Sequence, residues 1–333
     1  MWLLHALPAW SLGFALAAAS PTPITSRQSG GAPWLAIDSD FPDPSFLQAP
    51  DGSWYAFGTN GNNRRVQVAV SSDFHSWTLT DVEALPTLAP WETAIDHWAP
   101  DVIRRDDGRY VMYYSGEARS QVRHHCVGVA ISVSTSPLGP YIPNDEPLSC
   151  RLDRGGSIDP AGFRDTDGSR YVLFKLDGNS IGNGGDCNNG NPPILDTPIM
   201  LQPVEEDGFT LRGDAIEILH RSTEDGDGPL VEAPSMVLVD GVYYLFYSTH
   251  CFTDVLYDVR FATATSVTGP FEKGNESIVR TGDFGLTSPG GATVWVDGDG
   301  GGERILFHGF CREGVRCTYA AELGIGSGTV SFV

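Results

Sequence analysis

Three carboxylates in this chain stand close to prolines, and their chemistry suits acid–base catalysis. Asp43 lies in Pro42-Asp43-Pro44, Asp159 precedes Pro160, and Glu232 lies in Glu232-Ala233-Pro234. Hydrolysis of a glycosidic bond needs one carboxyl group to donate a proton and a second to activate water or attack the sugar. A third acid can keep the pKa of the donor high, because like charges at short range resist joint ionisation. The three residues form a candidate hydrolytic set if the fold brings them together.

The elements that must position these acids form a repeat. A proline-containing segment is followed by Asp-Gly and then by an aromatic or β-branched run, and the Asp-Gly pairs recur 56 to 73 residues apart. Repeating units of short strands at this spacing are typical of a β-propeller, in which equivalent positions converge on a central axis. We therefore expect an all-β fold with the three acids at equivalent positions of one mouth. The five segments are Pro42-Asp43-Pro44, Ala99-Pro100-Asp101, Asp159-Pro160-Ala161, Glu232-Ala233-Pro234 and Ser288-Pro289-Gly290.

The other acids of the repeat are predicted to be structural. Asp-Gly is a hairpin-turn signal, and strand-like runs such as residues 53–59 and 109–115 follow it directly. Asp101 follows its proline, whereas the three candidate catalytic acids precede theirs, so we interpret it as a network-forming acid. The predicted turn acids are Asp51, Asp107, Asp167, Asp240 and Asp297.

The net charge limits the partners of the chain. Its 333 residues carry a formal charge of −21, and Lys175 and Lys273 are its only lysines. Nucleic acid, anionic membranes and acidic polysaccharides would repel such a chain, so a neutral substrate is expected. The alternative that the acidity only maintains solubility stays open.

The N-terminal segment predicts secretion. An apolar stretch from Leu3 to Ala19 is followed by small residues and prolines. This pattern is typical of a signal peptide, here over residues 1–20, followed by a flexible leader over 21–32 and a single domain over 33–333. A transmembrane anchor is the alternative, although Pro8 and Gly13 interrupt the stretch.

Six cysteines fit the oxidising compartment that secretion would provide. We expect the pairs Cys126–Cys150, Cys187–Cys251 and Cys311–Cys317. The only N-glycosylation sequon begins at Asn275 and is expected on a loop. The protein is therefore expected outside the cell.

Four motifs resemble those of glycoside hydrolase family 43 and follow the family's order, over Phe41 to at least His308. The resemblance implies a five-bladed β-propeller that acts by an inverting single displacement. It also implies plant cell-wall pentosans as substrates, from which α-L-arabinofuranosyl or β-D-xylosyl residues are released. The motifs are Phe41-Pro42-Asp43-Pro44-Ser45, His97-Trp98-Ala99-Pro100-Asp101-Val102, Ser157-Ile158-Asp159-Pro160 and Val231-Glu232-Ala233-Pro234.

The resemblance further implies the role of each acid. Asp43 is expected to be the general base, Glu232 the general acid, and Asp159 the modulator of the acid's pKa and orientation. For inversion, base and acid should lie roughly 6.5–9.5 Å apart, which leaves room for a water molecule. No cofactor is expected to be required.

Other site positions are also implied by the resemblance. Trp98 is expected to form an apolar wall of the sugar site, since aromatic faces pack well on sugar rings. Phe41 and Ile158 are expected to contact the substrate, and Arg316 to contact both the sugar and the modulator acid. His308 matches an axial histidine that lies near a calcium ion or a water cluster; a buried, hydrogen-bonded histidine is the alternative.

The loop over residues 179–193 is rich in Gly and Asn and is expected to shape the cleft, with Lys175 and Asn179 lining it. A pocket closed by loops favours exo action, so we prefer an exo-acting, monomeric arabinofuranosidase or β-xylosidase. The alternatives are an endo-1,5-α-L-arabinanase, a retaining fructan or sucrose hydrolase, and a non-catalytic carbohydrate-binding propeller.

Overall fold

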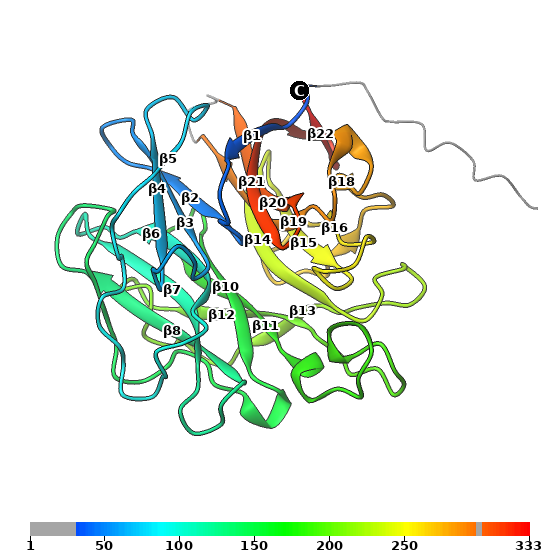
Figure 1. The fold of residues 1–333 in the computed structure, drawn as a ribbon, viewed down its shortest axis with the longest axis horizontal. Helices are drawn as coiled ribbons and strands as arrows, with labels where there is room; N and C mark the ends of the chain where they lie inside the picture. The colour runs from blue at the N-terminus through cyan, green and yellow to red at the C-terminus, as the bar shows by residue number, and fades with distance from the viewer. Residues whose placement is uncertain (1–30, 298–301) are drawn as a thin grey trace, which may run out of the picture.

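Five antiparallel sheets surround a central axis in the computed structural model, which describes residues 31–297 and 302–333 (Figure 1). The chain is an all-β, five-bladed propeller, as expected, and the described residues contain no α-helix, only short 3₁₀ turns. Within them, no helix is long and apolar enough to cross a membrane. The expected signal peptide, most of the leader and the turn at Gly298 lie outside the described residues.

The first four blades follow the chain from the axis outward, and their inner strands pack on one another. Each blade is a meander in which consecutive strands pair, except that β18 pairs with β16. The strands are β2 (Ser45–Gln48), β3 (Trp54–Gly58), β4 (Gln67–Ser71) and β5 (Thr78–Leu79); β6 (Trp98–Arg104), β7 (Tyr110–Glu117), β8 (His125–Ser132) and β9 (Tyr141–Pro143); β10 (Ser157–Arg164), β11 (Arg170–Leu176), β12 (Ile199–Val204) and β13 (Ile216–Leu219); β14 (Val231–Val239), β15 (Val242–Thr249), β16 (Asp258–Ala264), β17 (Glu272–Lys273) and β18 (Val279–Arg280).

The fifth blade joins the two ends of the described chain. Its order is β1-β21-β20-β19, with β22 also paired to β21. Trp34 of the N-terminal strand lies opposite Ala320, so β1 closes the ring. The strands are β1 (Trp34–Ile37), β19 (Gly290–Val296), β20 (Glu303–Arg312), β21 (Val315–Gly326) and β22 (Thr329–Phe332).

Apolar side chains buried between neighbouring blades hold the ring together. Tyr244 and Phe246 of the fourth blade pack with Ile305 and Phe307 of the fifth, and all four are fully buried. Burial of one such side chain contributes about 1.5–3 kcal/mol. The rigid inner strands that result can hold side chains at the axis in fixed positions.

The Asp-Gly pairs form the turns between first and second strands in the first four blades, as predicted. Their glycines have φ between 76° and 91°, a backbone conformation that costs little without a Cβ atom. The carboxylates of Asp51, Asp107 and Asp167 each accept a hydrogen bond of 2.8–3.0 Å from the N–H two residues on. These acids are turn formers.

The opposite end of each inner strand has a bulge or a residue in the left-handed backbone region. The register shifts between Trp98 and Asp101, between Ile158 and Ala161, between Glu232 and Ser235, and between Gly290 and Thr293. The residues with positive φ at this level are Asp43, Ala99, Asp159, Ala233 and Gly291.

This register corrects the predicted equivalence of the three acids. Asp43 and Asp159 share one position, but Glu232 stands one residue earlier in its blade, level with Trp98 and Ile158. In the fifth blade the equivalent of Asp159 is Gly291 rather than a residue of Ser288-Pro289-Gly290. The position predicted from the prolines was wrong for Glu232. In Glu232-Ala233-Pro234 an alanine separates the acid from the proline, whereas Asp159 directly precedes Pro160, so it is Ala233 that is equivalent to Asp159.

All three expected disulfides are present: Cys126–Cys150, Cys187–Cys251 and Cys311–Cys317. The second joins the loop after β11, which contains the 3₁₀ turns η2 (Gly178–Ile181) and η3 (Asp186–Asn188), to the loop after β15. Asn275 is exposed on a bend between β17 and β18, as expected.

Candidate active site

A ring of hydrogen bonds links the blades at the level of the bulges. Each residue with positive φ donates its backbone N–H to a side chain of another blade. In four cases the acceptor occupies the equivalent position of its own blade: Ser115, Ser248 and His308 lie in the second strand, and Thr59 directly follows it. The four bonds are Ala99 N to Thr59 Oγ1 (2.8 Å), Asp159 N to Ser115 Oγ (3.0 Å), Gly291 N to Ser248 Oγ (3.0 Å) and Asp43 N to His308 Nδ1 (3.1 Å).

The fifth position of this ring differs. Lys175 of β11 stands level with Ser115 and Ser248, but an ammonium group offers no acceptor. The N–H of Ala233 instead donates to Oδ2 of Asp159 at 3.1 Å. One of the three acids is thus tied to the strand that carries Glu232.

Asp43 is held in its ionised form. Burial opposes ionisation, but the charge of Arg316 and a 2.6 Å hydrogen bond from the Thr59 hydroxyl outweigh it and hold the pKa of Asp43 well below its usual range. Arg316 Nη1 lies 3.5 Å from Asp43 Oδ1. His308 Nδ1 also lies 3.2 Å from that oxygen, but it accepts the Asp43 N–H, so it is not a donor to the carboxylate. An ionised carboxylate beside the cavity can accept a proton from water.

Asp159 has the opposite tendency. Burial and the nearby charge of Glu232 raise the pKa of Asp159 to about 8, against the opposing effect of Lys175. Asp159 therefore retains its proton at neutral pH. The site therefore contains one acid that is ionised, Asp43, and one that retains its proton, Asp159.

Glu232 is bonded to a buried ammonium group. Its Oε2 lies 3.1 Å from Lys175 Nζ, and Asp177 Oδ1 lies 3.3 Å from the same nitrogen. The Lys175 side chain is 1% exposed, and its carboxylate neighbours raise its pKa, although burial alone would lower it. Lys175 is charged throughout the physiological pH range.

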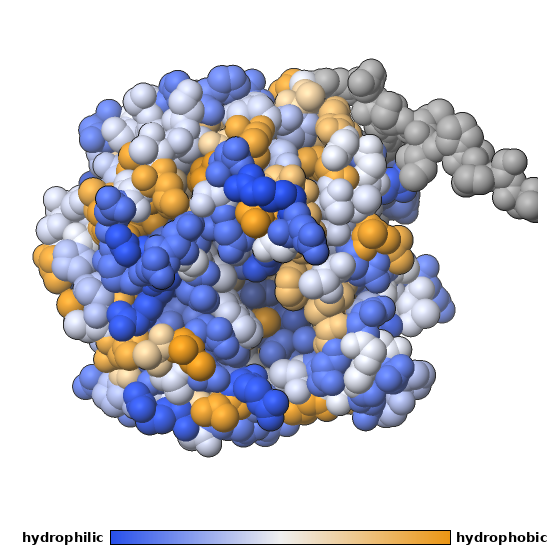
Figure 2. Space-filling view, viewed as in Figure 1, coloured by the Kyte–Doolittle hydropathy of each residue, from blue (hydrophilic) through white to orange (hydrophobic). Residues whose placement is uncertain are grey.

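The three acids line one cavity of about 400 Å³, a size in the usual range for small-molecule sites. Figure 2 shows a hollow near the middle of the face in view, with mostly hydrophilic residues around it. Trp98 and Ile158 also line the cavity, as do Lys175 and Asn179. The Trp98 ring stacks on the buried ring of His125 with their centroids 3.7 Å apart. This support fixes the orientation of the tryptophan.

The loop over residues 179–193 forms part of the cavity wall, as expected, through Asn179, Ser180 and Cys187. Phe252 lines the cavity from the loop to which Cys187 is disulfide-bonded through Cys251. The disulfide therefore joins the two loops on this side of the cavity.

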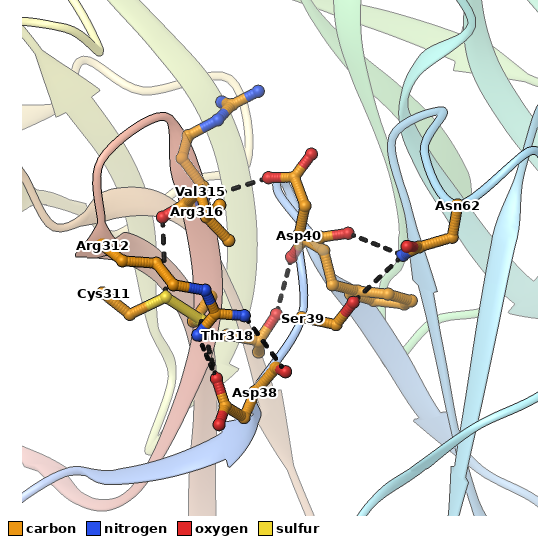
Figure 3. Close-up of a disulfide and its surroundings, with 11 residues drawn as sticks. Asp38, Ser39, Asp40, Asn62, Cys311, Arg312, Val315, Arg316 and Thr318 are labelled. Atoms are coloured by element: carbon orange, nitrogen blue, oxygen red, sulfur yellow. Dashed lines mark hydrogen bonds and ion pairs between the residues drawn. A yellow bond between two sulfur atoms is a disulfide. The ribbon is translucent and has the colours of Figure 1, made fainter.

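Arg316 reaches the cavity from β21, held on both sides. Its guanidinium lies over the Phe252 ring, 4.7 Å from the centroid, and its backbone N–H donates to Asp40 Oδ1 at 3.0 Å (Figure 3). Arg312 pairs with Asp38 beside the Cys311–Cys317 disulfide, as the same view shows. Asp38 lies near both sulfur atoms, but these are committed to the disulfide and are not available to a metal.

Phe41 is a correction to the expected site. Its side chain is fully buried and does not line the cavity. A Cβ atom at Gly58 would lie 2.8 Å from the Phe41 ring, so the ring packs against the second strand of its blade. Phe41 supports the backbone before Asp43 from within the core.

His308 is fully buried, and burial lowers its pKa, so the ring is neutral. Because Nδ1 accepts the Asp43 N–H, the ring proton is on Nε2, which is buried and has no partner among the described residues. A protonated Nε2 cannot bind a metal directly, but it can donate to a water molecule. The site fits a water cluster, or a calcium ion contacted only through water.

Asp101 is structural, as predicted. Its Oδ2 accepts the N–H of Gly162 at 2.7 Å, burial raises its pKa to about 6, and it does not line the cavity. Sequence reasoning missed Thr59 and Phe252. A comparison of the second strands would have placed Thr59 level with Ser115, but Phe252 lies in a loop without any repeat to reveal it.

Comparison with known proteins identifies a family. The family model for glycosyl hydrolases family 43 matches residues 36–326. The β-D-galactofuranosidase xynD of Aspergillus niger is 31% identical over 251 residues, which are 72% of this chain and 64% of that protein. The chain thus spans less than two thirds of that relative.

Two further comparisons agree with the family match. The extracellular endo-α-(1→5)-L-arabinanase 1 of Bacillus subtilis is 27% identical over 281 residues, 78% of this chain and 79% of that protein. Among solved structures, a thermostable family-43 glycoside hydrolase has a TM-score of 0.74 at 24% identity, covering 92% of this chain and 95% of its own. At that identity the likeness shows the fold alone.

Proposed function

The chain belongs to glycosyl hydrolases family 43, and from this premise we propose that it is a secreted, exo-acting enzyme that removes terminal α-L-arabinofuranosyl residues from neutral pentosans by inversion. The observation that carries the proposal is the convergence of Asp43, Asp159 and Glu232 in one cavity. Their environments differ in the sense that acid–base hydrolysis needs, because Asp43 is an ionised carboxylate and Asp159 is a protonated carboxyl group.

The proposed mechanism uses each acid once. Asp43 accepts a proton from a water molecule as its oxygen attacks the anomeric carbon. The bond from that carbon to the leaving oxygen breaks, and Glu232 donates its proton to that oxygen. Asp159 orients the strand of Glu232 by accepting the Ala233 N–H, and it lies close enough to influence the acid by its charge. Trp98, Ile158 and Arg316 would hold the sugar.

The proposed substrate is supported by the class of relatives that match this chain. Relatives that act on arabinan, xylosides and galactofuranosides all match this chain. A β-D-galactofuranosyl residue is the second candidate, because the relative that acts on it matches at 31% identity over 72% of this chain. The two furanose rings share their configuration from C1 to C4 and differ in the exocyclic group. A β-D-xylosyl residue, a six-membered ring, is the third substrate to test.

Exo action is supported by the loops that bound the cavity. Residues 178–193 and the loop at Phe252 stand at its rim and are joined by the Cys187–Cys251 disulfide. A joined rim leaves less room for a polymer to extend past the cleavage point than an open groove does. Endo action on arabinan is the contrary outcome.

Secretion is supported by the three disulfides and by the extracellular relatives. If calcium binds at the axis, His308 would contact it through a water molecule and would thereby help to fix Asp43. None of the proposed steps passes through a metal.

The test is product analysis with purified protein and its Glu232→Gln and Asp43→Asn variants. Substrates are p-nitrophenyl α-L-arabinofuranoside, β-D-galactofuranoside and β-D-xyloside, together with linear arabinan and arabinoxylan. We expect free arabinose from the parent chain, with rates reduced about 10²–10⁴-fold in either variant. Proton NMR of the first product should show the inverted anomer.

The outcomes distinguish the alternatives. A ladder of arabino-oligosaccharides from linear arabinan would replace exo with endo action. Retention of the anomeric configuration would contradict the roles given to Asp43 and Glu232. A folded protein that binds these glycans but releases no sugar would overturn the catalytic proposal in favour of a binding propeller.

A further inference from the structure

Within the described part of the chain, Lys175 is the one residue at its level of the blades that does not take part in the ring of hydrogen bonds between neighbouring blades. Thr59, Ser115, Ser248 and His308 each accept the N–H of the neighbouring bulge. Lys175 occupies the same position and makes no such bond among the described residues. Since a serine there would complete the ring, the repeat alone does not account for a lysine.

The contacts of Lys175 point into the cavity. Its ammonium lies 3.1 Å from Glu232 Oε2 and 3.3 Å from Asp177 Oδ1, and its side chain is 1% exposed. Glu232 itself is 13% exposed and Asp177 7% exposed, so water screens the pair little. Asp177 alone would suffice to neutralise a lysine, yet the ammonium is shared with the candidate acid.

We propose that Lys175 is a positioning residue for the general acid, holding the Glu232 carboxyl group at one point of the cavity through the 3.1 Å contact to Oε2. This inference rests on the proposed function of the same site. A carboxyl group fixed in this way can deliver its proton to the glycosidic oxygen from one defined position. Lys175 itself keeps its three protons.

Other titratable groups lie near Lys175 and Glu232, and their charges also influence the pH dependence of activity. The Lys175 ammonium is the only cation in hydrogen-bond contact with Glu232 among the described residues. Its charge also lowers the pKa of Asp159, against the larger effects that raise it. The titratable and charged groups around the pair are Asp43, Asp159, Asp177, Tyr257, His308 and Arg316.

The experiment compares the pH profiles of kcat/KM for the parent and Lys175→Met, which keeps most of the side-chain volume but removes the charge. We expect Lys175→Met to lose activity about 10²-fold near pH 6 and to shift its alkaline limb upward by about 1–3 pH units. The shift is upward because the charge of Lys175 lowers the pKa of Asp159, so loss of the cation makes Asp159 harder to ionise. An activity loss with an unmoved alkaline limb would reduce Lys175 to a packing role and overturn the inference.

Two controls separate charge from packing. Lys273→Met removes the other lysine, which bonds Asp225 at 3.1 Å and Asp227 at 2.5 Å away from the cavity, and should leave both activity and the alkaline limb unchanged. Lys175→Ala should regain activity on addition of ethylammonium, which can enter the cavity. Failure of every alkylammonium ion to restore activity to a folded Lys175→Ala protein would contradict the role of the charge.

A readout without substrate keeps the inference separate from the proposed function. Parent and Lys175→Met are melted from pH 5 to 10. The stability of the parent should decline up to about pH 8 as Asp159 loses its proton, whereas that of the variant should keep declining above it. Coincident profiles would overturn the inference even if the parent releases arabinose, and separated profiles would support it even if no substrate is found.

Discussion

Asp159 lies near the start of strand β10 and Asp167 lies in the turn that follows the strand, and the same side chain has opposite roles in the two places. Asp159 lines the cavity, where burial and Glu232 raise its pKa to about 8. Asp167 is exposed in the turn, and the N–H of Ser169, at 2.8 Å, lowers its pKa. The residue type is shared, so the chemistry is decided by what surrounds each carboxyl group.

The same contrast holds in other blades. In the first blade, Asp43 lies at the cavity and Asp51 at the turn. Asp101 is a third case, a buried acid on an inner strand that accepts the Gly162 N–H and does not reach the cavity. A propeller thus has a functional end and a structural end, and position along the inner strand separates acids that a composition count would treat alike.

The largest loss of activity is expected from Asp159→Asn, which removes the titratable proton of the Asp159 carboxyl group without changing the shape of the side chain. We expect activity to fall about 10²-fold or more, measured as kcat/KM on p-nitrophenyl α-L-arabinofuranoside. A variant with parental activity would show that Asp159 belongs with the structural acids.

The pH dependence of the stability of Asp159→Asn measures the same proton without a substrate. A raised pKa means that the native carboxyl group binds a proton that the unfolded one has released. Its contribution to stability is complete below about pH 4 and is lost as the pH rises towards about 8. Thermal melts of Asp159→Asn should therefore lack part of the decline that the parent shows between these values.

An intermediate effect is expected from Ser115→Ala, compared with Ser248→Ala. Each removes the acceptor of one bulge N–H, at Asp159 and Gly291 respectively, and should lower the free energy of unfolding by about 1–3 kcal/mol. Only Ser115 supports a catalytic acid, so its variant should lose more activity. Equal activity losses at equal stability would show that the ring, rather than the acid it holds, limits the reaction. Denaturant titration and kcat/KM supply both values.

The smallest effect is expected from Asp167→Asn, the matched change in the turn that follows β10. The side chain is exposed, and asparagine can keep the turn hydrogen bond. Activity should be unchanged and Tm should shift by no more than about 2 °C, measured by calorimetry. A large activity loss would mean that this turn and the cavity are coupled.

The sequence predicted the features that repeat or pair locally. The propeller and the turn acids follow from spacing and composition, and Asp43 and Asp159 share a position because each directly precedes a proline. The three expected disulfides are confirmed, and two of them, Cys126–Cys150 and Cys311–Cys317, join cysteines that are near in sequence. Glu232 was placed one position out, because its bulge begins one residue before the alanine–proline pair.

The side-chain contacts between blades could not be predicted from the sequence. Lys175 and Glu232 are separated by 57 residues, and only the closed ring brings them within 3.1 Å. Phe41 shows the converse error, since a motif position next to a catalytic acid proved to belong to the core. Alternation in a strand gives the face of a side chain, but not which neighbour covers it.

The pairing of Trp34 with Ala320 has a consequence for synthesis. Strand β1 leaves the ribosome first among the described strands, yet its partner β21 leaves almost last. The fifth blade therefore cannot be completed while the first four blades emerge, and β1 must remain unpaired throughout that time. Contacts this distant in sequence are slow to form. Ring closure should therefore be slower than the folding of any one of the first four blades, whose paired strands are near one another in sequence.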